Sequence, residues 1–424
     1  MNPDRSQAPE QHPFSCPDFL SPEKIRLSNG IPCCFWQQDD YKLIRLDVRV
    51  QAGSSLQERP GIALATLKML QEGTREHPGE QWAAALDAEG AFIENLSDRD
   101  YATLSLHFPQ QAAAKVLSLL KEMLTAPLFT DERLELLKFQ QRQSLAINME
   151  KTAYLAYRDF STVLYTENHP YGRFLSMEDI AAWKAEELET FFHSLYVPSA
   201  MRVFMAGNLT AEVRRLLDET LGSLPQRPWL GREPGDVTES VPCSRRREKS
   251  GSVQASICMG RVLFGRTHPD WLQMNVLNRV LGGYFGSRLM TEIRERSGLA
   301  YGIYSHLASM RHAGHFYIAA DVNADAAGEA VEKIKRELTR LCEEKIPDEE
   351  LQRVRKYEFG SLLRGFDGLF QQMERQMDVD DYGMDAAYWK AYVQTLVSLT
   401  ADGLRELARL YLSPETMTVV TVGA

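Results

Sequence analysis

A long internal repeat constrains the fold of this 424-residue chain more than any other feature of its sequence. Residues 195–207 read LYVPSAMRVFMAG, and residues 410–423 read LYLSPETMTVVTVG, one residue longer. The closing glycines, Gly207 and Gly423, lie 216 positions apart, which is about half the chain. Each copy follows an amphipathic helical pattern and contains a short apolar run that ends at glycine. We therefore expect two homologous halves of about 210 residues, each closed by the same helix, loop and strand.

Between the two halves, the sequence loses its periodicity. Prolines and glycines gather over residues 225–242, and the basic run Arg245–Arg247 follows. This change predicts an N-terminal extension over residues 1–23, a first domain over 24–222, a linker over 223–250 and a second domain over 251–424. We expect the basic run to be a solvated part of the linker, and a docking patch is the alternative.

Strand and helix patterns alternate within each half. Residues 43–51 largely alternate apolar and polar side chains, as a half-buried strand does, whereas residues 62–72 have helical spacing. Helices are also expected over 79–89, 111–123, 131–165, 186–194, 270–281, 288–296 and 402–409, and strands over 101–107, 253–258, 302–307 and 314–322. The interleaving predicts an α+β fold.

Composition argues against several classes of protein. Lys and Arg number 48 and Asp and Glu 58, so the net charge of −10 does not suit a surface that neutralises phosphates, and no nucleic-acid partner is expected. No apolar run approaches the roughly 18–20 residues that cross a bilayer, so no membrane span is expected. The six cysteines have no Cys-x-x-Cys spacing, and the first twenty residues lack the features of an export signal. A cytoplasmic location is expected, or a periplasmic one if a signal peptide has been removed.

Several segments resemble, in order, the M16 family of zinc peptidases, which includes the insulinase-like and pitrilysin-like enzymes. They are residues 51–74, 90–100, 169–172, 196–209 and 282–301. The resemblance covers nearly the whole chain from about residue 24. It implies two M16-like halves, each a sandwich of helices on a mixed sheet. Family members of this length pair with a second such chain to close a chamber.

The motif that defines the zinc site of this family is missing. His-x-x-Glu-His places two imidazoles and a carboxylate on one face of a helix, where they hold zinc and activate water. Its three functional positions fall on Leu64, Leu67 and Lys68. Leucine has no ligand atom and an ammonium group repels a cation. The third ligand of the family falls near Ser144 or Leu145, so no metal is expected in this chain and zinc is expected in a partner subunit.

No other part of the sequence rebuilds the motif. The one Glu-His pair, Glu76–His77, has no first ligand and is followed by proline. His306, His312 and His315 fall in a predicted hairpin, where ordinary surface or core roles are favoured over a metal site. His169 is expected to belong to a structural turn.

One functional element of the family is retained. Residues 292–301 resemble a segment in which an Arg and a Tyr seven positions later reach toward the zinc-bound peptide; here they are Arg294 and Tyr301. The resemblance implies that both stabilise peptide carbonyls and the oxyanion. The alternative is a solvated charge on a helix and an aromatic that packs on a strand. The resemblance also implies an edge strand over 91–97 that receives an extended peptide at Glu94 and Asn95, although many members have Asn at the first of these.

These features predict the substrate-binding subunit of a heteromeric M16 peptidase. It would supply half of a chamber and the Arg294 and Tyr301 pair to a partner that carries His-x-x-Glu-His, and the substrate would be an unstructured peptide. A structural subunit without catalysis, similar to the inactive M16-like core proteins of the respiratory chain, is the alternative. A catalytic homodimer with another mechanism is the third option.

Overall fold

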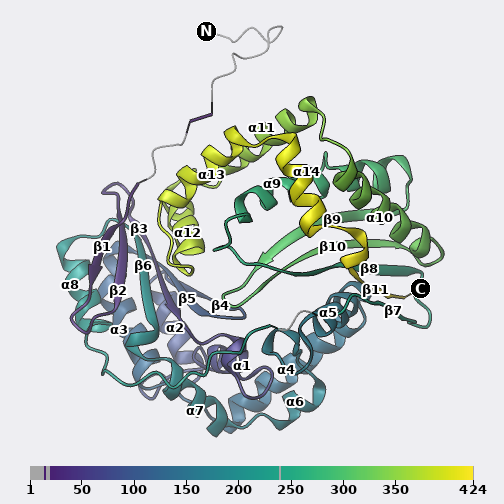
Figure 1. The fold of residues 1–424 in the computed structure, drawn as a ribbon. Helices are drawn as coiled ribbons and strands as arrows, with labels where there is room; N and C mark the ends of the chain where they lie inside the picture. The colour runs from purple at the N-terminus through teal and green to yellow at the C-terminus, as the bar shows by residue number, and fades with distance from the viewer. Residues whose placement is uncertain (1–13, 16–19, 238–239, 424) are drawn as a thin grey trace, which may run out of the picture.

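The structure, a computed structural model, describes residues 14–15, 20–237 and 240–423. It has the predicted α+β fold, with two β-sheets that are each covered by helices (Figure 1). The six strands of the first sheet have the order β1 (Glu23–Arg26), β2 (Pro32–Gln37), β6 (Met201–Gly207), β3 (Leu43–Val50), β5 (Ala102–Pro109) and β4 (Phe92–Ser97). The five strands of the second have the order β7 (Ser244–Arg247), β11 (Thr418–Val422), β8 (Gln254–Leu263), β10 (Gly314–Asn323) and β9 (Ala300–Ser309).

The two sheets share one topology, as the sequence repeat predicts. Without β1, the strands of the first sheet follow β2-β6-β3-β5-β4 and those of the second follow β7-β11-β8-β10-β9. In each sheet the first of these pairs is parallel and the others are antiparallel. The offset of 216 residues is also kept, because helix α7 (Ala185–Leu195) begins at residue 185 and α14 (Ala401–Tyr411) at 401.

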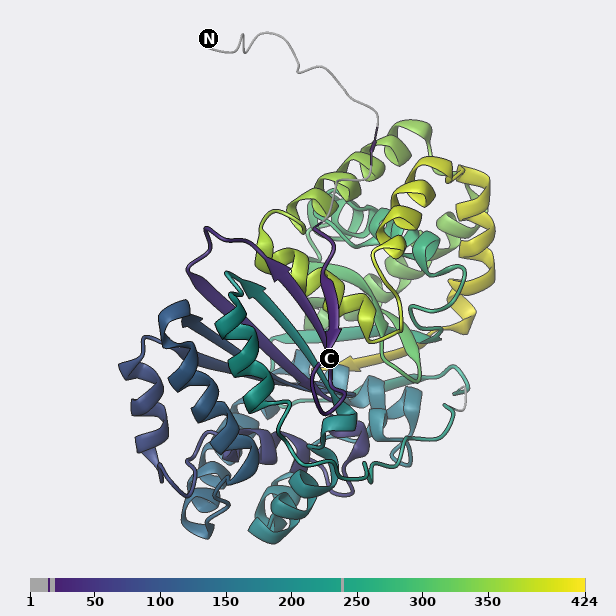
Figure 2. The ribbon, with the colours of Figure 1, turned by 90° about the vertical axis from the view of Figure 1, so that its left-hand side faces the viewer.

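Helices cover one face of each sheet, here called its outer face, and bury its apolar side chains. In the first half these are α1 (Ile62–Met69), α2 (Glu80–Ala88), α3 (Ala113–Thr125), α4 (Asp131–Met149), α6 (Met177–Ala182), α7 and α8 (Ala211–Thr220). In the second they are α9 (Trp271–Leu281), α10 (Ala327–Glu343), α11 (Asp348–Arg364), α13 (Ala387–Ser398), α14 and η5 (Met290–Arg296), a π-helix. Figure 2 shows the two layered halves one above the other.

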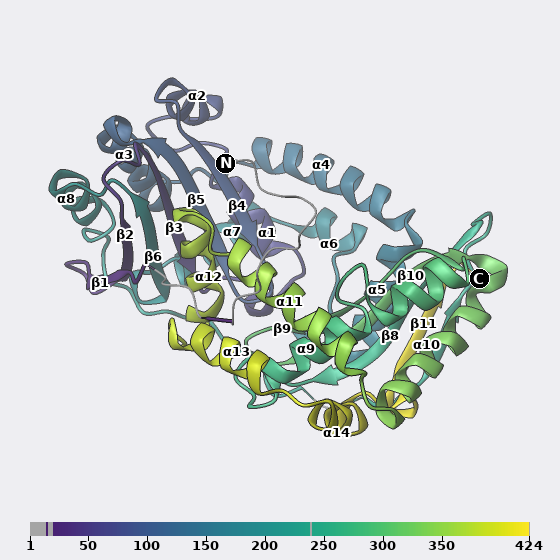
Figure 3. The ribbon, with the colours of Figure 1, turned by 90° about the horizontal axis from the view of Figure 1, so that it is seen from above.

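Each half also places one helix on the opposite face, here called the inner face, of the other half's sheet. Helix α5 (Thr152–Tyr165), from the first half, packs with Phe160 against Cys258 and Val420 of the second sheet. Helix α12 (Leu369–Asp380), from the second half, packs with Met373 against Phe204 of the first sheet (Figure 3). Their positions differ by about the repeat length, so they are equivalent helices, and their exchange joins the halves.

Two expectations about local structure are wrong, and one helix differs in type. The helical stretch predicted over 131–165 is two helices, because the chain leaves the helical conformation at Lys151, whose ψ is 119°. Residues 244–247 form strand β7, since their backbone pairs with β11 although all four side chains are exposed, so the basic run is not irregular linker. The helix predicted over 288–296 is present, and its residues 290–296 form the π-helix η5, in which the Ser297 N–H donates to the Glu292 carbonyl five residues earlier at 3.1 Å.

In the part of the chain that the structure describes, no helix is long and apolar enough to cross a membrane. Cysteines 33, 34, 243, 258 and 342 are free thiols, and Cys16 lies outside the described residues.

Candidate functional site

Helix α1, which carries the three residues predicted at the zinc-motif positions, is built into the first core. It begins after Gly61, whose φ of 87° favours glycine, and a Cβ there would lie 2.3 Å from the ring of Trp183. Leu67 is buried, Leu64 is half-buried and Lys68 is exposed. These side chains offer no zinc ligand, and no cluster of three His, Cys, Asp or Glu that could hold a metal occurs among the described residues.

Strand β4 lies beside α1 at the edge of the first sheet. The Asn95 amide donates to the Leu67 carbonyl at 3.2 Å, which ties the strand to the helix, and the Oδ1 atom of Asn95 is buried without a partner among the described residues. Along β4, Phe92, Glu94 and Leu96 are exposed. Since β4 pairs with β5 alone among the described strands, its second backbone edge is open to an extended peptide.

The inner face of the first sheet is charged. Arg45 on β3 pairs with the buried Asp47 at 2.9 Å, and it also contacts Glu374 of α12 at 2.5 Å. His107 on β5 stacks on Phe92 with the ring centroids 4.6 Å apart. Burial lowers the pKa of His107, and the positive charge of Arg45 adds to the effect. This wall therefore carries fixed charges and a neutral imidazole beside the edge strand.

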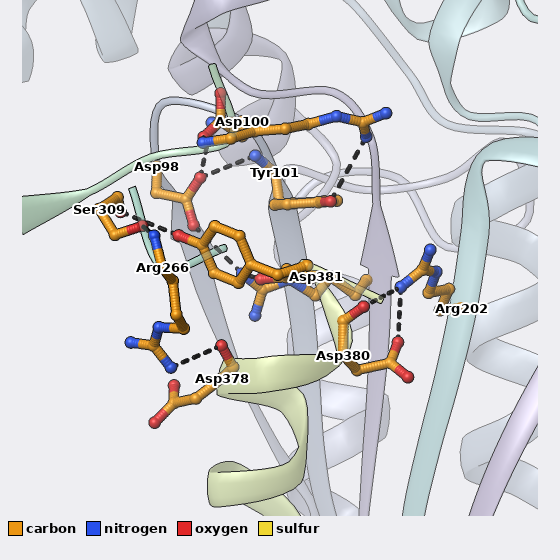
Figure 4. Close-up of polar contacts among 12 residues, drawn as sticks. Asp98, Asp100, Tyr101, Arg202, Arg266, Ser309, Asp378, Asp380 and Asp381 are labelled. Carbon is orange, nitrogen blue, oxygen red and sulfur yellow. Dashed lines mark hydrogen bonds and ion pairs between the residues drawn. The ribbon is translucent and has the colours of Figure 1, made fainter. Parts of the chain in front are cut away.

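Further polar contacts hold the end of α12 against this wall (Figure 4). Arg202 on β6 donates to the carboxylate of Asp380 at 2.6 Å, and Arg49 on β3 contacts Asp381 at 2.6 Å. Burial raises the pKa of Asp381 to about 7, and the opposing charge of Arg49 does not offset it. The ion pair of Asp381 with Arg49 is therefore sensitive to pH below neutrality.

The second half brings Arg294 and Tyr301 together. Arg294 lies on η5 and Tyr301 on β9, and the turn between them has Gly298 at a φ of 62°. The guanidinium carbon of Arg294 lies 5.9 Å from the centroid of the Tyr301 ring and 5.3 Å from that of Phe285. Tyr301 is 85% exposed and Phe285 64%. Arg294 thus lies over two exposed rings, and its donors and the Tyr301 hydroxyl are available to a ligand.

A cavity of about 370 Å³ adjoins Tyr301 on the inner face of the second sheet. Tyr157, Tyr304 and Tyr317 also line it, and the rings of Tyr304 and Tyr317 lie 6.0 Å apart in an edge-to-face arrangement. This cavity is not among the sites predicted from the sequence. A period of two predicts that Tyr304 and Tyr317 share one face of the paired strands β9 and β10. It does not predict that Tyr301 joins them, because Tyr301 lies at the register shift opposite Asp321 and Val322. It also does not predict the helix that brings Tyr157.

The predicted site residues therefore form two groups. In the first half, Asn95 contacts helix α1, which carries Leu64, Leu67 and Lys68. In the second half, Arg294 contacts Tyr301. Between the described residues of the two groups, no hydrogen bond or ion pair is formed. His169 accepts from the Tyr171 N–H at 3.1 Å and so forms a turn, as expected.

Two family models match the chain. The model described as Insulinase (Peptidase family M16) matches residues 37–166, and that described as Peptidase M16 inactive domain matches residues 182–357. The chain belongs to the M16 peptidase family. This confirms the resemblance read from the sequence; the second model begins within the first half and continues into the second.

Some relatives of the chain are named as proteases and one is named as a non-peptidase. The chain is 23% identical over 357 residues to the uncharacterized zinc protease YmxG of Bacillus subtilis, covering 83% of this chain and 86% of that one. It is 26% identical over 318 residues to the non-peptidase homolog YmxG of Helicobacter pylori, covering 73% of each. These similarities support membership of the M16 family, but the names of the relatives do not agree on whether such a chain is a peptidase.

Solved M16 structures have the same fold. A peptidase M16 inactive domain from Pseudomonas fluorescens superposes with a TM-score of 0.87 at 22% identity, over 95% of this chain and 98% of that one. A protease from Helicobacter pylori gives a TM-score of 0.86 at 18% identity, over 96% and 100%. The fold therefore extends over almost the whole chain.

Proposed function

We propose that this M16 chain is the zinc-free subunit of a heteromeric peptidase and contributes Arg294 and Tyr301 to the zinc site of a partner chain. The observation that carries the proposal is the contact between Arg294 and the exposed Tyr301, on a chain whose α1 helix has no zinc ligand. A cation and a phenol hydroxyl that face solvent together suit the oxyanion and carbonyls of a peptide bound opposite them.

The partner in this proposal is an M16 chain with an intact His-x-x-Glu-His helix, and the zinc belongs to that chain. The names of relatives support a non-catalytic role, since they include a non-peptidase homolog and an inactive domain. The substrate is an extended peptide, which the open edge of β4 would receive near Glu94 and Asn95. Residues 24–222 and 251–424 would each form one wall of the chamber. Free thiols fit a cytoplasmic complex.

The test is mutation of the pair in a reconstituted complex with a zinc-bearing partner. We expect Arg294→Ala and Tyr301→Phe each to lower kcat by about a hundred- to a thousand-fold, because donors at a developing oxyanion act mainly in the transition state. Arg294→Lys should not restore turnover, since an ammonium lacks the planar fork. Arg296→Ala, on the same helix and paired with Glu292 at 3.2 Å, is the matched control. Unchanged turnover in both pair variants would refute the proposal.

A scaffold subunit is the second candidate, and the name of the Helicobacter pylori relative favours it. In that case the partner would cleave peptides at its full rate without this chain. The pair variants would then assemble normally and leave kcat unchanged, which separates the two functions.

A further inference from the structure

A cavity of about 420 Å³ lies where β3 ends and β6 begins, and Arg294 and Tyr301 do not line it. Four arginines from four segments line it: Arg26, Arg49, Arg202 and Arg311. Among the described residues, no aspartate or glutamate belongs to its lining, although the chain has a net charge of −10. We propose that this cavity binds a small polyvalent oxyanion, of the phosphate or carboxylate class, and that the bound anion joins the two halves.

Arg202 and Arg49 each contact carboxylates of the chain through a single guanidinium nitrogen. Arg202 uses Nη1 to donate to the carboxylate of Asp380 at 2.6 Å and to its carbonyl at 2.7 Å (Figure 4). Arg49 uses Nη2, which lies 2.6 Å from Asp381 and 3.5 Å from Asp98. The Nε atom of Arg49 is buried without a hydrogen-bond partner among the described residues. A buried donor without a partner is costly, so the Arg49 guanidinium is not fully satisfied by its carboxylate contacts.

The other two arginines close the cavity from its sides. Arg311 lies in the turn between β9 and β10, and it contacts Glu233 at 2.9 Å and the Tyr101 hydroxyl at 3.5 Å. Arg26, at the end of β1, donates to the Gly30 carbonyl at 2.9 Å. The carboxylates that hold Arg49, Arg202 and Arg311 do not line the cavity. They therefore fix the guanidinium groups in place and leave the cavity side to a ligand.

The chemistry of this lining selects an oxyanion. A guanidinium presents parallel N–H donors that match the two oxygens of a carboxylate or phosphate. The other polar side chains of the lining, those of Asn29, Gln51, Gln226 and Tyr101, are neutral and add no negative charge. A cavity of this volume holds a molecule larger than a single phosphate, so pyrophosphate and citrate are suitable probes of the two classes.

Such a ligand would bridge the halves. Arg26, Arg49 and Arg202 belong to the first half, whereas Arg311 belongs to the second. Arg49 and Arg202 also bind the end of α12, which comes from the second half. A ligand that binds only the folded arrangement raises the stability of the fold in proportion to its occupancy. Binding and thermal unfolding should therefore report the same event.

The experiment is calorimetric titration of the isolated chain with pyrophosphate and with citrate at constant ionic strength, together with thermal unfolding. We expect saturable binding of one molecule per chain by at least one probe, with a rise in Tm. The probe that binds more tightly identifies the class. Arg26→Ala and Arg311→Ala should each weaken binding by about 10- to 100-fold, because a charge-assisted contact is lost.

Arg215→Ala is the matched control, because this exposed arginine lies on α8 and pairs with Glu212 and Glu219 outside the cavity. It should bind as the unmodified chain does. We expect the Arg26 variant to fold normally, because the Arg26 side chain donates only to the Gly30 carbonyl among the described contacts of this site. Circular dichroism would check this. Absence of saturable binding by both probes, or equal affinity in the Arg26, Arg311 and Arg215 variants, would overturn the proposal. Peptide cleavage plays no part in this test, so its outcome is independent of the proposed function.

Discussion

Helices α5 and α12 occupy equivalent places on the two inner faces, yet they hold their sheets with different chemistry. On the second sheet, the buried polar contact of α5 is neutral: the Tyr165 hydroxyl donates to the Gly314 carbonyl at 3.1 Å and lies 2.9 Å from Nδ1 of His315. The ion pair of α5 with this sheet, Asp159 with Arg247 at 3.1 Å, is more exposed. On the first sheet, α12 forms ionic contacts, such as that of Asp381 with Arg49 at 2.6 Å. The topology thus decides where the exchanged helix lies, and the side chains decide how its contact responds to pH.

The two contacts should respond to pH in opposite directions. Burial lowers the pKa of His315 to about 3, so the unfolded chain takes up a proton that the folded chain does not, and this stability is lost as the pH falls below about 6.5. Burial raises the pKa of Asp381 to about 7, so the folded chain keeps a proton that the unfolded chain has lost. Its contribution is largest below about pH 4 and is lost as the pH rises toward 7.

The largest effect is expected from Phe160 in the α5 contact. It is fully buried, and Phe160→Ala should lower the free energy of unfolding by about 3–5 kcal/mol through lost apolar burial and a new cavity. The equivalent change in the α12 contact, Met373→Ala, should cost about 2–5 kcal/mol. Denaturant unfolding measures both, with the exposed Leu410→Ala as the control. Costs below about 0.5 kcal/mol in both would mean that the exchanged helices do not join the halves.

His315 should set a large part of the acid sensitivity of the α5 contact. In His315→Gln, the loss of stability between pH 7 and pH 5 should be smaller than in the unmodified chain, because the buried imidazole no longer has to take up a proton on unfolding. Unfolding in urea at several pH values measures this difference. His193→Gln changes an exposed histidine and is the control. An unchanged pH dependence in the His315 variant would contradict the buried neutral assignment.

Asp381 should give the smaller effect, because its counter-charge is retained nearby. Between about pH 4 and pH 7, ionisation of Asp381 should lower the stability of the unmodified chain relative to Asp381→Asn, so the difference between the two chains should shift in favour of the variant as the pH rises. Exposed Asp325→Asn is the control. The same urea series suffices. If the Asp381 variant instead lost more stability with rising pH, its carboxylate would be stabilised by Arg49 and the comparison of the two contacts would fail.

Much of the fold was predictable from the sequence. The internal repeat predicts two halves of similar structure, and apolar residues spaced every 2 or every 3.6 positions predict most of the strands and helices. The exchange of α5 and α12 was not predictable, since an apolar helix face does not say which sheet it meets. Strand β7 was missed for a related reason: Arg245–Arg247 gain their strand from backbone pairing with β11, which side-chain patterns do not report.

The candidate site divides in the same way. The loss of zinc ligands at Leu64, Leu67 and Lys68 could be read directly, because it concerns residue identity. The arginine cavity could not, since Arg26, Arg49, Arg202 and Arg311 are separated along the chain and meet only through the strand order and a turn from the other half.

The most direct test of the proposed function is peptide cleavage by a zinc-bearing M16 partner, measured with and without this chain. We expect neither chain alone to cleave an unstructured peptide efficiently and the mixture to cleave it roughly a hundred-fold faster, because this chain adds donors at the oxyanion. Co-purification of the two chains would confirm that they pair. A partner that reaches the full rate alone, with no increase when this chain is added, would contradict the account and identify the chain as a scaffold.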